Sequence, residues 1–336
     1  MEVDSKNEIV RVSVIIVNWN SGKLLDCCLQ HLNAQRYPIR QIIVIDNAST
    51  DSSIAGIQDH FPDVEIFCVK KNTGFAAANN LAVQQALDCE WIALLNPDAM
   101  PEADWLERLM VAVRVFPEVS FFGGRLLQAK YPDRLDGAGD AYHISGRVWR
   151  RGHGLMTDNH YMHVEEIFSP CAAAALYRRD AFESVGGFDE DFFCYFEDID
   201  LGFRLRLAGH HCLLIPDAVA YHVGSATTGG QHGNFAVYHG HRNLVWTYVK
   251  NMPGVLFWLM LPLHIALNLV TIAWFSLQGK GSVILRAKWD ALCGIPRMWE
   301  KRRDIQSHRV ASVGEIWKAL DKQLLPRWSQ IRRMWS

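Results

Sequence analysis

Val12-Ser13-Val14-Ile15-Ile16-Val17-Asn18 is a run of mostly β-branched residues that ends in an amide side chain. Further apolar runs follow at 42–45, 64–69 and 91–95. The segments between these runs, such as 24–32 and 76–87, have helical spacing. Continuous apolar strands that alternate with helices are typical of a parallel sheet covered on both faces. The first hundred residues therefore predict an α/β fold with a mostly parallel sheet flanked by helices.

Polar side chains follow these apolar runs, at the points where the predicted strands end. They are Asn18, Asp46, Asn47, Asn72, Asn96 and Asp98. Ligands of such sheets bind at the edge where the parallel strands end. One such residue would be an ordinary turn former, but several in succession predict a binding site at this edge.

The loop Leu95-Asn96-Pro97-Asp98-Ala99 is a candidate metal site. Pro97 fixes the backbone, so Asn96 and Asp98 can present oxygens toward one point. Oxygen ligands suit Mg²⁺ or Mn²⁺, which commonly bind through one or two carboxylates together with substrate phosphates. The alternative is a turn that caps the next helix. The chain has neither GxGxxG after its first strand nor GxxxxGK[ST], which disfavours a dinucleotide-binding fold and a P-loop.

Phe193-Cys194-Tyr195-Phe196-Glu197-Asp198-Ile199-Asp200-Leu201 places three carboxylates directly behind four aromatic or apolar residues. Mutual repulsion and desolvation raise the pKa of at least one such carboxylate. A carboxylate in that state can accept a proton from a hydroxyl nucleophile. The alternative is a solvated helix N-terminus, where acids interact favourably with the helix dipole.

Six motifs in this order resemble family 2 inverting glycosyltransferases of the GT-A fold, and most closely their bacterial rhamnosyltransferase-like branch. The motifs lie at 14–20, 45–51, 72–79, 96–98, 186–189 and 197–201. The resemblance covers about residues 10–250. It implies a catalytic domain over 1–250, with a donor half at about 10–125 and an acceptor half at about 126–250.

The resemblance also implies roles for individual residues. Asp46 would hydrogen-bond the pyrimidine base, and Asn18 with the Asn72-Thr73-Gly74 loop would line the nucleotide and ribose. The full set of donor-binding residues is Asn18, Asp46, Asn47, Asn72, Gly74, Asn96, Asp98 and Arg242. Asn96 stands where the family has Asp, which removes one formal charge from the metal motif. Arg242 would pair with the diphosphate. The alternative interpretation is that its segment is an ordinary helix N-terminus.

For catalysis, the resemblance implies that Asp198 is the general base, with Glu197 beside it. Asp98 would bind Mg²⁺ or Mn²⁺, and His222 is either a second ligand of that metal or a structural residue. The reaction would be a direct displacement that inverts the anomeric configuration. The favoured donor is dTDP-rhamnose, with UDP-sugars as an alternative, and the acceptor is a lipid-linked or cell-surface glycan.

The composition changes after residue 251. The stretch 253–277 carries no charge, and about 20 apolar residues can span a bilayer. Residues 280–336 then hold 13 Lys and Arg against 5 Asp and Glu, with two amphipathic patterns. The first pattern comprises Leu285, Trp289 and Leu292, and the second comprises Ile316, Leu320 and Leu324.

A basic, tryptophan-rich tail predicts contact with an anionic membrane. We therefore expect 251–336 to be a helical region at the cytoplasmic face of the membrane, with 253–277 in-plane or re-entrant rather than a full span. A buried core helix or a homo-oligomer interface is the alternative. Nucleic acid is disfavoured as a partner because no recognisable nucleic-acid motif accompanies the basic residues.

Two other functions remain open. A sugar-nucleotide nucleotidyltransferase would use the same kind of sheet, but it usually carries a glycine-rich and basic loop after the first strand. Here the segment 18–23 has one Gly and one Lys. A non-catalytic membrane scaffold is the other possibility, and the intact Asp98, Glu197 and Asp198 argue against it.

Overall fold

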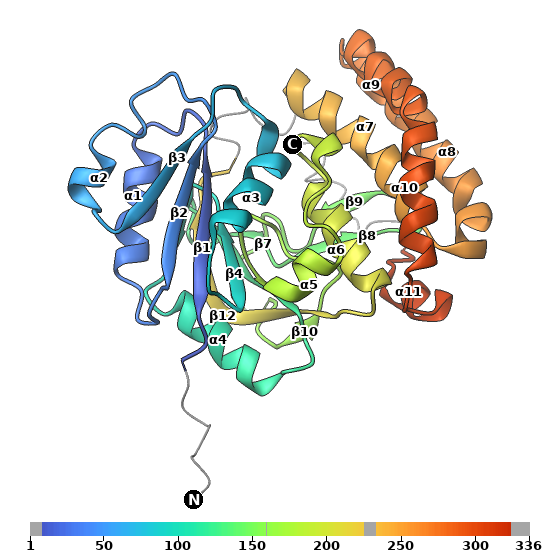
Figure 1. Ribbon diagram of the computed structural model, residues 1–336. Coiled ribbons are helices and arrows are strands. Elements are labelled where there is room, and N and C mark those ends of the chain that lie inside the picture. Colours follow the sequence, from blue (N-terminus) through green and yellow to red (C-terminus); the bar gives the residue numbers. More distant parts are fainter. Residues whose placement is uncertain (1–8, 159, 225–232, 324–336) are drawn as a thin grey trace, which may run out of the picture.

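The computed structural model describes residues 9–158, 160–224 and 233–323. A large sheet lies at its centre, and the C-terminal helices α7–α10 lie together on the side away from α1 and α2 (Figure 1). The strand order is β10-β12-β6-β11-β4-β1-β2-β3. The chain is therefore an α/β protein, as the sequence predicts.

The first half of the chain forms the parallel part of this sheet. Its strands are β1 (Val12–Asn18), β2 (Gln41–Asp46), β3 (Val64–Cys68) and β4 (Trp91–Leu95). The intervening helices include α1 (Leu24–Asn33), α2 (Ile57–His60) and α3 (Gly74–Gln85). All four strands pair in parallel, with β1 between β2 and β4. Each predicted apolar run is confirmed as a strand.

The second half makes the sheet mixed. Its larger strands are β6 (Phe121–Gln128), β11 (Ala174–Arg178) and β12 (Cys212–His222), and its smaller ones are β5 (Ala99–Pro101), β7 (Leu135–Gly137) and β10 (Glu165–Glu166). Strand β11 is antiparallel to both β4 and β6, while β12 runs parallel to β6. A separate hairpin joins β8 (Asp140–Tyr142) to β9 (Val148–Arg150).

Alternating side chains of β1 build two cores, one on each face of the sheet. Val14 and Ile16 pack on one face with residues of α1 and of α4 (Trp105–Val115). Ile15 and Val17 pack on the other face with residues of α3, of α5 (Arg179–Ser184) and of α6 (Glu197–Leu207). Because successive side chains of a strand point to opposite faces, a continuous apolar run requires cover on both sides.

The C-terminal helices are α7 (Asn234–Asn251), α8 (Gly254–Leu277), α9 (Gly281–Cys293), α10 (Ile295–Ser307) and α11 (Val313–Ala319). A third core joins Tyr142 and Phe203 of the sheet-forming part to Phe257, Met298 and Ile316 of these helices. Helix α11 begins at a capping box formed by Ser312 and Glu315. The predicted domain boundary after residue 250 falls in the last turn of α7, and the division into domains stays a prediction.

Helix α8 confirms that the uncharged stretch is helical. Within the described part of the chain, it is the one helix long and apolar enough to cross a membrane by length and composition. It is not a core helix of this fold, because its apolar side chains are largely exposed, as with Trp258 (63%) and Leu269 (62%). The predicted apolar face of α9 is likewise exposed at Leu285, Trp289 and Leu292. Leu324 lies outside the described residues.

A histidine of α8 helps to attach the helix to the rest of the protein. His264 is buried, and its Nδ1 donates to the backbone oxygen of Ser145 at 2.7 Å. Its ring stacks on Tyr248 with the ring centroids 3.9 Å apart. This contact joins α8 to the turn between β8 and β9.

A buried ion network holds the start of α6 against α7. Lys250 Nζ donates to Asp200 at 2.8 Å and also to Asp189. Asp200 is fully buried and accepts further hydrogen bonds from Arg204 Nε and Asn251 Nδ2. Burial raises the pKa of Asp189, but Lys250 and Lys301 outweigh this and hold that pKa well below its usual range.

We expect Lys250→Met to lower the free energy of unfolding by about 3–5 kcal/mol, because it removes the buried cation that Asp189 and Asp200 share. Urea denaturation followed by circular dichroism measures this change. Lys318→Met replaces an exposed lysine of α11 and should stay within about 0.5 kcal/mol of wild type. A loss below about 1 kcal/mol for Lys250→Met would mean that the network is not stabilising.

Candidate active site

A cavity of about 1170 Å³ opens at the carboxyl edge of the parallel strands. It extends from this edge past the start of α6 to helix α8. The predicted site residues that line it are Asn47, Asn72, Gly74, Asn96, Asp98, Glu197, Asp198 and His222. Side chains from both halves of the chain therefore meet in one space.

Asn18 and Asp46 lie directly behind this cavity, at the ends of adjacent strands. They are paired in the register of β1 and β2, and both are buried. Asn18 Nδ2 donates to Asp46 Oδ1 at 2.9 Å and to Ser53 Oγ at 2.9 Å. The neighbouring Val17 and Trp19 line the cavity instead. Asn18 therefore orients the Asp46 carboxylate.

Asn47 connects the end of β2 to the loop at 72–74. Its Nδ2 donates to Asn72 Oδ1 at 3.0 Å and to the Gly74 carbonyl at 3.1 Å, while its Oδ1 accepts from the Thr73 amide at 2.9 Å. Gly74 has a φ of +86°, and a Cβ there would lie 2.5 Å from the Phe193 carbonyl oxygen. The close approach of two backbones explains the glycine. It also places the loop at 72–74 against the acidic segment.

The Asn96-Pro97-Asp98 turn is not the cap of the next helix. The N-cap residue of α4 is Asp104, whereas Asn96 and Asp98 both line the cavity. Strand β5, which begins at Ala99, pairs with the end of β12 so that Ala99 lies opposite His222. This pairing brings the last residue of β12 beside Asp98.

Asp98 and His222 fit the ligand set of a divalent cation. His222 Nε2 lies 3.3 Å from Asp98 Oδ1, and this buried nitrogen has no hydrogen-bond partner among the described residues. The other ring nitrogen, Nδ1, lies 2.9 Å from Asp136 Oδ2. A carboxylate behind a histidine is the usual support of a metal-binding imidazole. Burial lowers the pKa of His222, but Asp136 and Asp98 outweigh it and raise the pKa to about 9.

The acidic segment enters helix α6 through a strained loop. Phe193, Tyr195 and Phe196 all have positive φ, a conformation that is rare for residues other than glycine. The buried Asn243 holds this loop, because its Nδ2 donates to the carbonyls of Phe192, Cys194 and Tyr195 at 2.7–3.0 Å. Such conformations persist only where surrounding contacts impose them, and they concentrate at functional sites.

The three carboxylates of this segment have different environments. Asp198 is half-buried in the cavity and accepts from the Ile199 amide at 2.8 Å. Burial raises its pKa, and Arg150 opposes the rise. Glu197 is buried beside it, its Oε2 lacks a hydrogen-bond partner in the described structure, and burial together with Asp198 raises its pKa well above the usual value. Asp200 points away into the ion network.

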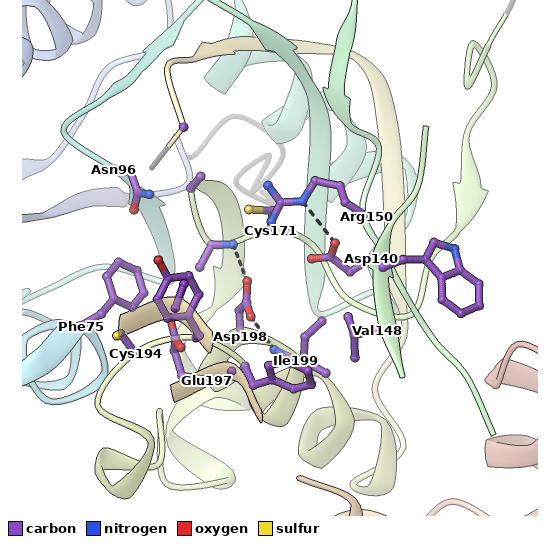
Figure 2. Close-up of a pocket in the computed structure, with 18 of the residues that line it drawn as sticks. Phe75, Asn96, Asp140, Val148, Arg150, Cys171, Cys194, Glu197, Asp198 and Ile199 are labelled. Atoms are coloured by element: carbon purple, nitrogen blue, oxygen red, sulfur yellow. Dashed lines mark hydrogen bonds and ion pairs between the residues drawn. The ribbon is translucent and has the colours of Figure 1, made fainter. Parts of the chain in front are cut away.

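The sequence prediction missed a group of residues beside Asp198. Carboxylate oxygens of Asp140 and Asp198 and the Cys171 sulfur lie within 4.8 Å of one another. Arg150 donates from Nε to Asp140 Oδ1 and from Nη1 to Asp136 Oδ2, each at 3.2 Å. Figure 2 shows Arg150 and Asp140 with Cys171 in the same part of the cavity wall as Asp198. Arg150 and Asp136 therefore connect the two ends of the site, from His222 to Asp140.

The pKa of Asp140 is raised, as are those of Glu197 and Asp198. Burial raises its pKa, Arg150 lowers it and Asp198 raises it further, with a net value of about 6. The available sequence signal was the pair of acids around the glycine-rich segment 136–140. That signal did not identify their arginine partner, which lies on another strand.

Arg242 lies behind the acidic loop rather than among the described residues that line the cavity. Its Nη2 donates to the carbonyls of Asp191 and Phe192, each at 3.0 Å. Its guanidinium also lies over the Trp246 ring, 4.3 Å from the centroid. These contacts support the loop, and a role in binding diphosphate stays a prediction.

The sequence model for glycosyl transferase family 2 matches residues 13–186, just over half of the chain. The chain belongs to glycosyl transferase family 2. The matched region contains β1 to β4, the Asn96-Pro97-Asp98 turn and the acids of 136–140. The predicted family is therefore confirmed.

This family 2 glycosyltransferase resembles two curated rhamnosyltransferases. The N-acetylglucosaminyl-diphospho-decaprenol L-rhamnosyltransferase of Mycobacterium tuberculosis is 27% identical over 238 residues, which cover 64% of this chain and 77% of that protein. The O-antigen chain rhamnosyltransferase RfbN of Salmonella typhimurium is 26% identical over 215 residues, covering 63% and 66%.

Solved structures establish the GT-A fold. GalNAc-T7 with UDP, GalNAc and Mn²⁺ matches with a TM-score of 0.59 and 15% identity, over 73% of this chain and 48% of that one. The mannosyltransferase PcManGT from Pyrobaculum calidifontis, in complex with GDP-Man and Mn²⁺, matches with a TM-score of 0.53 and 18% identity, over 93% and 88%. The chain thus spans about half of GalNAc-T7 and most of PcManGT.

Proposed function

We propose that this chain is an inverting glycosyltransferase that moves a sugar, with rhamnose favoured, from a nucleotide diphosphate sugar to a lipid-linked or cell-surface glycan. The observation that carries the proposal is the shared cavity, which Asp98, His222 and Asp198 all line. A direct displacement requires that the site of the leaving group and the general base lie in the same cavity.

Donor binding would use the carboxyl edge of β1, β2 and β4. Asp46, oriented by Asn18, would hydrogen-bond the base, and Asn47 with Asn72 and Gly74 would shape the nucleotide pocket. Asp98 and His222 would hold Mg²⁺ or Mn²⁺, which supplies charge stabilisation for the departing diphosphate. The Mn²⁺ in the GalNAc-T7 and PcManGT structures supports a divalent ion in this fold.

Asp198 would act as the general base. Burial raises its pKa, which makes it a better proton acceptor than an ordinary carboxylate, and Arg150 opposes that rise. Glu197 is buried beside it, and burial together with Asp198 raises the pKa of Glu197 well above its usual value, which favours the neutral form of its carboxyl group. The acceptor hydroxyl loses its proton to Asp198 as its oxygen attacks the anomeric carbon, so the configuration inverts.

The rhamnosyltransferase relatives support rhamnose as the sugar, with dTDP-rhamnose as the favoured donor and a UDP-sugar as the alternative. The decaprenol in the name of the mycobacterial relative supports a lipid-linked acceptor. Titration calorimetry with dTDP-, UDP- and GDP-sugars, with and without Mn²⁺, tests donor binding. We expect metal-dependent binding of at least one donor, and binding of none would contradict the proposal.

Removal of Arg150 should change the pH dependence of transfer. Its positive charge lowers the pKa of Asp198, so Arg150→Gln raises that pKa further. The base is then protonated at higher pH, and the acidic limb of kcat/KM should move to higher pH. Arg151→Gln is the matched control, because Arg151 pairs with Glu165 instead. If the acidic limb stays at the wild-type pH, Arg150 does not lower the pKa of the general base.

Helices α8 and α9 would hold the enzyme on the cytoplasmic face of the membrane. Trp258, Leu269 and Trp289 are exposed apolar side chains on these helices, and the cation Arg286 is 77% exposed. Apolar and basic side chains side by side are typical of an interfacial helix on anionic lipid.

We expect the protein to float with phosphatidylglycerol vesicles in a density gradient, and less so at 1 M salt because salt screens charge. Leu269→Asp should weaken flotation, whereas Leu87→Asp, at an exposed leucine far from α8 in the sequence, should not. Failure to float, together with dimer formation, would instead favour a homo-oligomer through the C-terminal helices.

A further inference from the structure

The cavity is lined by polar side chains at one end and by apolar side chains at the other. Its far wall is built by Leu263, Ala266, Leu267 and Val270 of α8. These residues follow the i, i+3, i+4, i+7 spacing of one helix face. The polar end at Asp98 and Asp198 and this apolar end belong to the same continuous space. A ligand that fills it has a polar head and an apolar tail.

Helix α8 presents three faces with different surroundings. His264 and Phe275 pack against the protein, and Leu267 faces the cavity, while Ile265 (50%) and Leu269 (62%) are exposed on the outside. The cavity face is thus adjacent to the outer apolar face. Val270 lines the cavity and is 65% exposed, which places it at the mouth. An apolar chain can pass from the outer face into the cavity without crossing a polar rim formed by α8.

A cation lies where the polar and apolar parts meet. Arg147 lines the cavity from the turn between β8 and β9, and its guanidinium lies 5.8 Å from the centroid of the Trp149 ring. Two residues earlier, Ser145 accepts the hydrogen bond from His264 of α8. The same contact that fixes α8 therefore holds the Arg147 turn beside the apolar face. Arginine binds phosphate oxygens through paired donors.

We propose that the α8 end of the cavity is the subsite for the isoprenoid chain of a diphosphate-linked acceptor, with Arg147 binding the diphosphate next to the chain. This assignment rests on the proposed transferase function and adds the position of the acceptor lipid. Arg147 supplies charge complementarity to the diphosphate, and the α8 wall supplies apolar cover for the chain. The saccharide then points toward Asp198.

Photo-crosslinking tests the subsite without requiring turnover. The full chain is irradiated with a farnesyl diphosphate analogue that carries a diazirine at the end of its chain, and the labelled residues are mapped by mass spectrometry. We expect label on the cavity face of α8, at 263, 266, 267 or 270, and competition by decaprenyl diphosphate. Label confined to 265 and 269, or no label on α8, would overturn the assignment.

Variants separate the two parts of the site. Leu267→Asn should weaken binding of the farnesyl diphosphate probe at least about tenfold, while Leu269→Asn, two residues away on the outer face, should not. Arg147→Gln should weaken the diphosphate probe about tenfold and leave the matching farnesol probe unchanged. If Leu267→Asn and Leu269→Asn weaken binding of the probe equally, the probe contacts only the surface of α8 and the proposed subsite is wrong.

Donor calorimetry makes the two proposals distinguishable. If nucleotide sugars bind but the probe labels another surface, the acceptor subsite is wrong and the transferase proposal stands. If the probe labels α8 while every nucleotide sugar fails to bind, the transferase proposal fails and an isoprenoid diphosphate site remains.

Discussion

Asp198→Asn is expected to lower kcat by about 10²–10⁴, which is the typical contribution of a positioned general base. The amide keeps the size of the carboxylate and can still accept from the Ile199 amide, so the start of α6 should keep its geometry. It cannot take the proton of the acceptor hydroxyl. The affinity for the donor should change little, because the donor side of the site is built by other residues.

The measurement is kcat at saturating donor and acceptor, paired with donor affinity by calorimetry. Glu190→Gln is a matched acid-to-amide control from the same segment, because Glu190 is exposed and lies outside the described cavity wall. It should keep near-wild-type kcat. Near-wild-type turnover of Asp198→Asn would show that another group accepts the proton.

Asp98→Asn is the second substitution with a large expected effect. It removes the only carboxylate charge of the Asn96-Pro97-Asp98 turn, whose Asp98 Oδ1 lies 3.3 Å from His222 Nε2. We expect kcat/KM to fall by about 10²–10³, comparable to the loss of one preorganised electrostatic contact at a developing charge. Mn²⁺ should also bind more weakly, since a neutral amide is a poorer ligand.

Mn²⁺ titration of activity separates the two contributions. If Asp98 acts through the metal, excess Mn²⁺ should restore part of the activity of Asp98→Asn. Glu107→Gln, at an exposed acid in the first turn of α4, is the matched control and should titrate like wild type. If Asp98→Asn keeps the wild-type dependence on Mn²⁺, Asp98 is not a ligand of the metal.

The grouping of polar residues at the sheet edge was predictable because these residues stand at the ends of parallel strands. Asn18, Asp46 and Asn96 each come directly after a buried run, and parallel strands bring such ends to one edge. The local sequence pattern was therefore sufficient to predict that these residues lie close together. Glu197 and Asp198 are neighbours in the sequence, and both line the cavity.

The missing part of the site depends on contacts between distant segments. Asp136, Asp140 and Arg150 meet through the β8–β9 hairpin and β7, which are short strands with little periodic signal. Strand β11, antiparallel between β4 and β6, was likewise not evident from the apolar pattern, because a short apolar run does not reveal its direction.

Helix α8 was predicted as an apolar helix, but its attachment was not. Hydropathy treats His264 as a polar interruption, whereas the structure uses it to anchor the helix at Ser145. Only the fold shows that one face of α8 lines the cavity while another is exposed. The membrane and acceptor proposals both depend on this arrangement.

The central claim is glycosyl transfer in this cavity with Asp198 as the base. The most direct test incubates the protein with a panel of dTDP-, UDP- and GDP-sugars, Mn²⁺ and a bacterial membrane lipid extract, and measures released nucleoside diphosphate together with the mass of the glycolipid product. We predict that one donor gives nucleoside diphosphate and a glycolipid heavier by one sugar, and that Asp198→Asn gives neither at a comparable rate. Release without a glycosylated product from any donor, or equal product from wild type and Asp198→Asn, would contradict the claim.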